Sequence, residues 1–138
     1  MPTSQKKVSL LGRSEAKLPS KPDRKVLETF TNRNKKRDFW ITLDCPEFTS
    51  LCPVTGQPDF ASLEICYIAD ELCVETKSLK FYLASFRSTP SFGEDVANRI
   101  LDDLVAVLKP RAMQIEAHFA PRGGISLTVE VAYPELNE

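Results

Sequence analysis

Apolar and polar residues alternate with different periods along the chain, and the changes of period mark the expected elements. Residues 39–45 ("FWITLDC") read as a short strand, and residues 59–69 read as a second one with an apolar face of Ala61, Leu63, Ile65 and Tyr67. The connection between them, residues 46–58, carries three prolines and a glycine and is expected to be a loop. Residues 112–120 and 124–133 alternate around "PRGG", which predicts a hairpin.

Two segments between these strand pairs follow a helical period instead. Residues 75–87 place Leu79, Tyr82, Leu83 and Phe86 at the i, i+3, i+4 and i+7 positions of one helical face. A second helix is expected from about residue 91 to 108, with Val96, Ile100, Leu101, Leu104, Val107 and Leu108 on its apolar side. Ser91 and Glu94 have the spacing of a capping box at its start, and Pro110 is expected to end it.

The order strand, strand, helix, helix, strand, strand indicates an α+β protein. An antiparallel four-stranded sheet with two helices on one face buries every apolar face that the pattern provides. The two sheet edges would stay exposed in a single chain, and joining edges between copies of the chain would cover them. We therefore expect a homo-oligomer.

Composition and charge describe a basic segment followed by an acidic domain. The chain has 138 residues, 42% hydrophobic and 27% charged, which fits one globular domain without a membrane segment or a secretory signal. Residues 1–37 carry a net charge of +8, and residues 38–138 carry −9. We expect residues 1–36 to form a partly disordered arm and residues 37–138 to form the domain. The arm has no nucleic-acid-binding pattern, so neither nucleic acid nor a membrane is expected as a partner.

The cysteines are expected to be free thiols in a reducing, cytoplasmic protein. They are spaced without a C-x-x-C pair, and the chain has a single histidine, so a zinc site is not expected. Cys52 lies between turn-forming residues and seven positions before Asp59, where a small molecule could reach it. Cys45, Cys66 and Cys73 read as structural, which is also the alternative for Cys52 itself.

Four short motifs occur in order along the chain: "SLCPVTGQPDF", "ETKSLKFYLASFR", "FGED" and "PRGGIS". Together they resemble the short, single-module form of the QueF family. These are NADPH-dependent nitrile reductases that convert 7-cyano-7-deazaguanine to its aminomethyl product in queuosine biosynthesis, a tRNA modification. The resemblance covers residues 37–133. It implies a tunnelling fold (T-fold), pentameric barrels stacked in pairs into a decamer, and active sites at subunit interfaces.

The resemblance also implies a covalent mechanism. Cys52 would be the nucleophile that adds to the nitrile carbon and gives a thioimide, which a hydride reduces more easily than the nitrile itself. Asp59 would donate the proton that the nitrogen gains. Because like charges oppose double ionisation, one proton shared between Cys52 and Asp59 is the coherent arrangement. Two NADPH molecules would deliver two hydrides in succession.

Binding residues follow from the same motifs. Val74, Glu75 and Thr76 would line the deazaguanine pocket, and Glu94 would accept hydrogen bonds from the amino and ring N–H groups of the guanine-like edge.

Three basic side chains, Lys77, Lys80 and Arg122, would hold the cofactor phosphates. The alternative for the two lysines is a solvated helix face, and for Arg122 a turn position.

One position departs from the family pattern. Gly93 precedes Glu94 in a substrate-contacting position where the family carries a histidine that helps to steer protons. This leaves a slower reductase, a chain arrested after adduct formation, or a relative with another reaction at the nitrile. His118 lies on the polar face of a strand and reads as a surface or interface residue. The alternative functions are a QueF-like amidinotransferase and a non-catalytic oligomer that binds purines or pterins.

Overall fold

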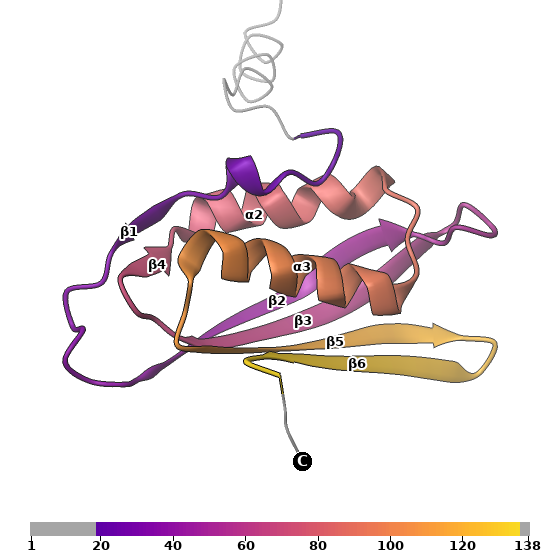
Figure 1. Cartoon of the computed structure of the whole chain (residues 1–138). Helices are drawn as coiled ribbons and strands as arrows, with labels where there is room; N and C mark the ends of the chain where they lie inside the picture. Colours follow the sequence, from indigo (N-terminus) through magenta and orange to yellow (C-terminus); the bar gives the residue numbers. More distant parts are fainter. Residues whose placement is uncertain (1–18, 136–138) are drawn as a thin grey trace, which may run out of the picture.

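The computed structural model describes residues 19–135. A four-stranded antiparallel sheet has the order β2 (Trp40–Leu51), β3 (Pro58–Ile68), β5 (Ala112–Arg122) and β6 (Ile125–Tyr133). Helices α2 (Thr76–Ala84) and α3 (Gly93–Leu108) pack side by side on one face of this sheet (Figure 1). The α+β architecture and the element order predicted from the sequence are confirmed. Within residues 19–135, no helix is long and apolar enough to span a bilayer.

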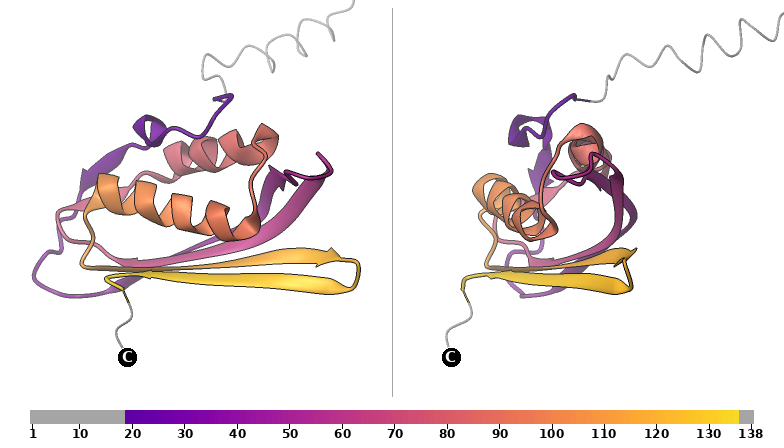
Figure 2. Two further views of the ribbon diagram at one scale, coloured as in Figure 1. Left: turned by 45° about the vertical axis from the view of Figure 1, so that its right-hand side comes forward. Right: turned by 90° about the vertical axis from the view of Figure 1, so that its right-hand side faces the viewer.

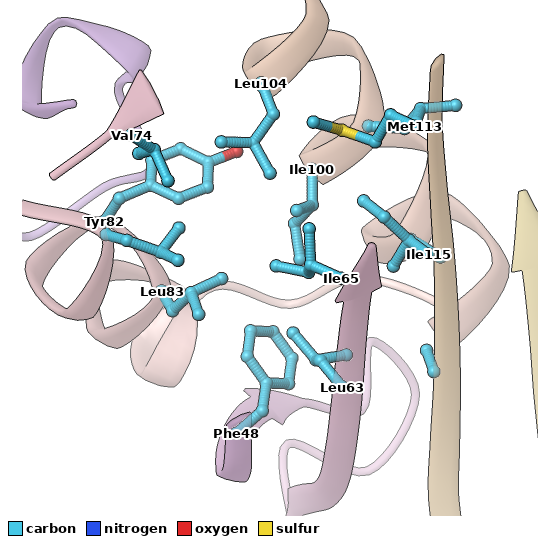
Figure 3. Close-up of a cluster of buried hydrophobic side chains, with 14 of the residues drawn as sticks. Phe48, Leu63, Ile65, Val74, Tyr82, Leu83, Ile100, Leu104, Met113 and Ile115 are labelled. Atoms are coloured by element: carbon cyan, nitrogen blue, oxygen red, sulfur yellow. The ribbon is translucent and has the colours of Figure 1, made fainter. Parts of the chain in front are cut away.

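The hydrophobic core lies between the sheet and the two helices, as Figure 3 shows. The apolar face predicted for the second strand is buried in β3. The predicted apolar face of the first helix is also buried, with Leu79, Tyr82 and Leu83 on α2 and Phe86 just after it. The apolar residues predicted for α3 are buried except Val107, which is partly exposed. The two-residue period of the strands and the 3.6-residue period of the helices predicted these buried residues correctly, because the apolar faces of the sheet and the helices pack against each other in one core.

β2 is longer than the sequence suggested, and the prediction of a loop over residues 46–58 was wrong. The strand continues to Leu51, with an irregular register between Cys45 and Phe48. Pro46 and Glu47 are absorbed there as a bulge on an edge strand, which is where a sheet tolerates proline. The connection to β3 shrinks to residues 52–57, so Cys52 is the first residue beyond the strand.

Part of the expected N-terminal arm packs on the domain. A short 3₁₀ helix η1 (Arg24–Val26) is followed by β1 (Thr29–Thr31), which pairs antiparallel with β4 (Leu72–Val74). Leu27 is buried in the core, and the Asn32 side chain donates a hydrogen bond to the Asp70 carbonyl oxygen over 3.0 Å. These strands were missed because three residues are too few to show a period. Residues 1–18 of the arm lie outside the described residues.

The predicted capping box at the start of the second helix is wrong. Helix α3 begins at Gly93 with Phe92 as its N-cap residue, and no side chain caps it. Ser91 therefore precedes the cap and does not accept a hydrogen bond from the first turn. Glu94 therefore does not serve as the second residue of a capping box. It lies exposed in the first turn of α3.

A buried polar contact joins the two helices. The first helix tightens after Ala84 into the 3₁₀ turn η2 (Ser85–Ser88). The Tyr82 hydroxyl donates a 2.5 Å hydrogen bond to Asp103 Oδ2 on α3, and Arg99 Nε donates to the same oxygen over 3.1 Å. Arg99 also donates to the Pro22 carbonyl oxygen over 3.0 Å, so this contact includes the N-terminal segment.

The open face of the sheet, opposite the helices, carries a row of acidic residues. Asp44 pairs with Glu64, Glu64 with Glu116, and Glu116 with Glu130, so each of the four strands contributes one carboxyl in register. Like charges directly opposite each other destabilise a sheet. The neighbouring Glu130 carboxyl and the loss of hydration raise the pKa of Glu116.

Candidate functional site

Cys52 lies in a tight turn at the end of β2. Its N–H donates to the Gln57 carbonyl oxygen over 2.8 Å, and its own carbonyl oxygen accepts from the Gly56 N–H over 2.9 Å. Gly56 has φ +71°, a left-handed conformation that glycine adopts without steric cost. The turn holds the partly exposed Cys52 side chain at a fixed place on the rim of the sheet.

The turn also favours the reactive form of the thiol. The Thr55 hydroxyl, then the backbone N–H groups of Thr55 and Val54, lower the pKa of Cys52 by hydrogen bonding to its sulfur. Partial burial and the Asp59 carboxylate act in the opposite direction. By contrast, burial raises the pKa of Cys45 and Cys73. Since the thiolate is the nucleophile, Cys52 is better prepared to react than these two thiols.

Asp59 lies at the start of β3 and forms an ion pair with the β5–β6 hairpin. Arg122 Nε lies 2.6 Å from Asp59 Oδ1. The same guanidinium donates to the Pro58 carbonyl oxygen over 2.8 Å and to Gln57 Oε1 over 3.4 Å. Arg122 therefore contacts the residues that close the Cys52 turn as well as Asp59.

The start of α3 is brought to the same end of the molecule by backbone contacts. The Leu51 N–H donates to the Thr89 carbonyl oxygen over 3.2 Å, and the Ser91 N–H donates to the Leu51 carbonyl oxygen over 3.0 Å. These bonds hold the segment before α3 along the last residue of β2. Cys52, Asp59, Glu94 and Arg122 thus come from four elements that meet at one end.

Phe92 is a residue that the sequence reasoning missed. It is 55% exposed at this same end, directly before Gly93 and Glu94. An aromatic side chain left open to solvent offers a flat apolar surface for a planar ligand. Its position next to the acidic "GED" turn was the available signal.

Gly93 is packed against the hairpin. A Cβ atom at this position would lie 2.8 Å from Phe119 Cε1 and 2.9 Å from Leu127 Cδ2. Side chains of β5 and β6 therefore occupy the space into which any larger residue at position 93 would project.

The second group of predicted substrate residues, Val74, Glu75 and Thr76, lies at the opposite end of the folded domain from Cys52. Figures 1 and 2 show that α2 begins beside β4, far from the turn after β2. The nine residues of α2 alone span about 13 Å. Val74 is buried, and Thr76 is exposed. One chain therefore does not bring residues 74–76 to Cys52.

Glu75 is the N-cap of α2. Its Oε2 accepts from the Lys77 N–H over 2.8 Å, and its Oε1 accepts from the Ser78 N–H over 2.7 Å. These two bonds lower the pKa of Glu75. Its carboxylate is fixed in orientation, and each oxygen keeps a lone pair for a further donor.

The remaining predicted residues lie apart from the Cys52 end. Lys77 and Lys80 are exposed on α2, and Lys80 borders a cavity of about 600 Å³ between α2 and the edge strand β2. His118 is exposed on the open face, with Nδ1 3.2 Å from Thr128 Oγ1 and Nε2 3.7 Å from Glu116 Oε1. Within one chain the neighbouring Phe119 side chain, and not His118, lies against Gly93. Residues 19–135 contain no cluster of three His, Cys, Asp or Glu side chains arranged for a metal ion.

The family model described as "QueF-like protein" matches residues 58–138, which include Asp59, Glu94 and Arg122. The chain belongs to this QueF-like family. Two similar proteins, both named NADPH-dependent 7-cyano-7-deazaguanine reductase, extend the similarity over Cys52 as well. The protein from Magnetococcus marinus is 54% identical over 112 residues, 81% of this chain and 88% of its own length. The protein from Porphyromonas gingivalis is 51% identical over 124 residues, 89% of this chain and 79% of its own length.

A solved structure supports the tunnelling fold expected for a QueF-like chain. The apo crystal structure of the archaeosine synthase QueF-Like superposes with a TM-score of 0.66 at 17% identity, over 71% of this chain and 96% of that one. At this identity the likeness concerns the fold alone.

Proposed function

We propose that this QueF-like chain reduces the nitrile of 7-cyano-7-deazaguanine to an aminomethyl group with NADPH. The observation that carries the proposal is the Cys52 thiol, which lies in an open turn with a lowered pKa and within the electrostatic influence of Asp59. The relatives at about half identity bear the name of this activity.

The first step joins Cys52 to the substrate. The Cys52 sulfur attacks the nitrile carbon, one carbon–nitrogen π bond opens, and the nitrogen takes a proton from Asp59, which has received the proton of the thiol. The product is a neutral thioimide, and no atom is gained or lost apart from the transferred proton. NADPH supplies the hydrides, two for each nitrile.

Recognition of the base needs residues from both ends of the folded domain. Glu94 accepts hydrogen bonds from the guanine-like edge in the first turn of α3, beside Gly93 and Phe92. Glu75, with Val74 and Thr76, lies too far from Cys52 in the same chain to join it. We infer that a neighbouring chain contributes this second group, so that the site is completed at a subunit interface.

The residues along α2 suit the cofactor. Lys77 and Lys80 offer positive charge to phosphate groups, and the cavity between α2 and β2 has an apolar wall that includes Leu79 and Leu83. This cavity borders the open sheet edge, where a neighbouring chain would add a further wall. The assembly that we propose is a homo-oligomer, two stacked pentamers by family resemblance, in the cytoplasm, where the free thiols stay reduced.

The test is to mix purified protein with the nitrile and to measure the mass of the protein by mass spectrometry before NADPH is added. We expect a mass gain equal to one substrate per chain, followed by NADPH oxidation at two equivalents per nitrile. Cys52→Ala abolishes the adduct, whereas the matched variant Cys66→Ala keeps it. An unchanged mass of the original chain, or an adduct on the Cys52→Ala variant, contradicts the proposal.

A further inference from the structure

Arg122 makes its polar contacts with the last residue of the Cys52 turn and the first two residues of β3. It forms an ion pair with Asp59 Oδ1 and donates hydrogen bonds to the Pro58 carbonyl oxygen and to Gln57 Oε1, which belong to three consecutive residues. Arg122 and Pro58 are 64 residues apart in the sequence. The guanidinium therefore fixes one end of the β5–β6 hairpin to the start of β3.

This contact replaces a backbone ladder that stops short. The pairing of β3 with β5 ends at Ala61 and Phe119, so Asp59 and Pro58 have no backbone partner in β5. Two residues beyond Phe119 lies Pro121, which has no N–H to donate. The Arg122 side chain supplies donors where the main chain of β5 does not.

The planar guanidinium group of Arg122 supplies several N–H donors at fixed angles as well as a positive charge. Nη2 donates a hydrogen bond to the Pro58 carbonyl oxygen, and Nε forms a 2.6 Å ion pair with Asp59 Oδ1, so the guanidinium is tied to the backbone while its charge lies against one oxygen of the carboxylate. The Asp59 side chain is 19% exposed, and the Arg122 side chain is 40% exposed. The pair therefore lies at the rim of the site, where a ligand can reach it.

We propose that Arg122 is a positioning residue that orients Asp59 toward Cys52 and screens the Asp59 charge from the thiolate. The inference rests on the proposed function, because Asp59 acts there as the proton carrier. It differs from the cofactor-phosphate role that the family resemblance implies for Arg122. In this structure the guanidinium would have to leave Asp59 and Pro58 to bind a phosphate fully.

The two roles differ in a step that occurs before NADPH binds. Without Arg122, the Asp59 carboxylate faces Cys52 uncompensated, and the thiolate becomes harder to form. A positioning role therefore affects Cys52 chemistry in the absence of cofactor, whereas a phosphate-binding role affects the KM for NADPH alone.

The experiment measures the rate at which iodoacetamide alkylates Cys52, by mass spectrometry of its peptide, as a function of pH. In the oligomeric full chain, Arg122→Gln is expected to move the midpoint of this profile to higher pH. It is also expected to slow formation of the nitrile adduct without NADPH by about 10- to 100-fold. Arg122→Lys keeps the positive charge but lacks the planar guanidinium. The pH profile of Cys52 alkylation should therefore return toward that of the original chain, while the rate of nitrile adduct formation should recover only in part. Arg24→Gln, which removes another exposed arginine, is the matched control.

The outcomes separate this inference from the proposed function. An alkylation profile that shifts in Arg122→Gln supports the positioning role even if the original chain forms no nitrile adduct, a result that would defeat the proposed function alone. An unchanged pH profile of Cys52 alkylation in Arg122→Gln overturns the positioning role. This holds if the adduct rate is unaffected and the KM for NADPH rises, and it holds equally if the adduct rate falls because the hairpin is disturbed.

Discussion

Gly93 and Phe119 are packed so closely that a Cβ atom on the glycine would come within 2.8 Å of the phenyl ring. Phe119 is 8% exposed and pairs with Ala61 on one side and Leu127 on the other. Where the family resemblance implies a histidine, the hairpin is therefore packed into the space where a side chain would begin.

Restoring that histidine is expected to cost stability. Gly93→His pushes against Phe119 and Leu127, and overpacking of this kind costs about 1–3 kcal/mol in the free energy of unfolding. Urea unfolding followed by circular dichroism measures the loss. Adding Phe119→Leu to the histidine variant is expected to recover part of it. A histidine variant as stable as the original chain would contradict the close packing.

Removing the Ser50 hydroxyl is expected to leave the fold intact or strengthen it. Ser50 is fully buried opposite Asp59, and its hydroxyl has no hydrogen-bond partner within residues 19–135. Ser50→Ala should raise the free energy of unfolding by about 1 kcal/mol. The control is Ser78→Ala, because Ser78 Oγ accepts from the Glu28 N–H over 2.9 Å and donates to the Glu75 carbonyl oxygen over 2.7 Å. Thermal unfolding should move in opposite directions for the two variants.

The contact between the helices is expected to contribute strongly to stability. Burial raises the pKa of Tyr82, so its phenol remains a hydrogen-bond donor to Asp103 at any pH at which the protein is handled. Tyr82→Phe removes this bond to a charged acceptor and should lower the free energy of unfolding by about 1.5–3 kcal/mol. Tyr133→Phe, at an exposed position, should have no measurable effect. Equal unfolding midpoints for the two variants would contradict the role of the contact.

The acidic row predicts a pH dependence. Because the pKa of Glu116 is raised above its ordinary value of 4.5, the folded chain binds a proton that the unfolded chain has released, and its stability falls as the pH rises through the folded pKa. Glu116→Gln cannot lose this proton. It should therefore unfold at a higher temperature than the original chain at pH 7 and at the same temperature below pH 4.5. A difference that stays constant from pH 4 to pH 8 would argue against the shift.

The separation of Glu75 from Cys52 predicts complementation between inactive variants. Cys52→Ala and Glu75→Gln are each expected to lose NADPH oxidation. After unfolding and refolding together in equal amounts, random assortment should restore about a quarter of the sites if each site takes one residue from each of two chains. Refolding the variants separately and then mixing them is the control. Recovery absent from the refolded mixture would show that both residues act within one chain.

Sequence patterns predicted the four sheet strands, both helices and a loop position for Cys52, because each depends on residues close together in the chain, although β2 was predicted too short. Periods of 2.0 and 3.6 revealed the faces of β3 and α3 without knowledge of their partners. The pairing of β1 with β4 was missed because each strand has three residues. The contact of Arg122 with Asp59 was missed for a different reason, since it forms only after the hairpin has been placed against β3.

The same limit applies to the candidate site. Its members could be named from motifs, but motifs carry no distances. Nothing in "ETKSLKFY" indicates that Glu75 also caps α2 or that it lies far from Cys52 in the same chain. Nor does "FGED" indicate that the hairpin fills the space beside Gly93. Tertiary packing decides both points.

The row formed by Asp44, Glu64, Glu116 and Glu130 also ties the sheet to its ionic surroundings. Neighbouring strands lie about 4.8 Å apart, well within the Debye length of about 8 Å at physiological ionic strength. Dissolved cations therefore screen these carboxylates only in part, and at about 1 M salt, where the Debye length falls to about 3 Å, the repulsion largely disappears. Concentrated salt is therefore expected to stabilise the folded chain, because counterions gather along the row of carboxyl groups that crosses the open face of the sheet.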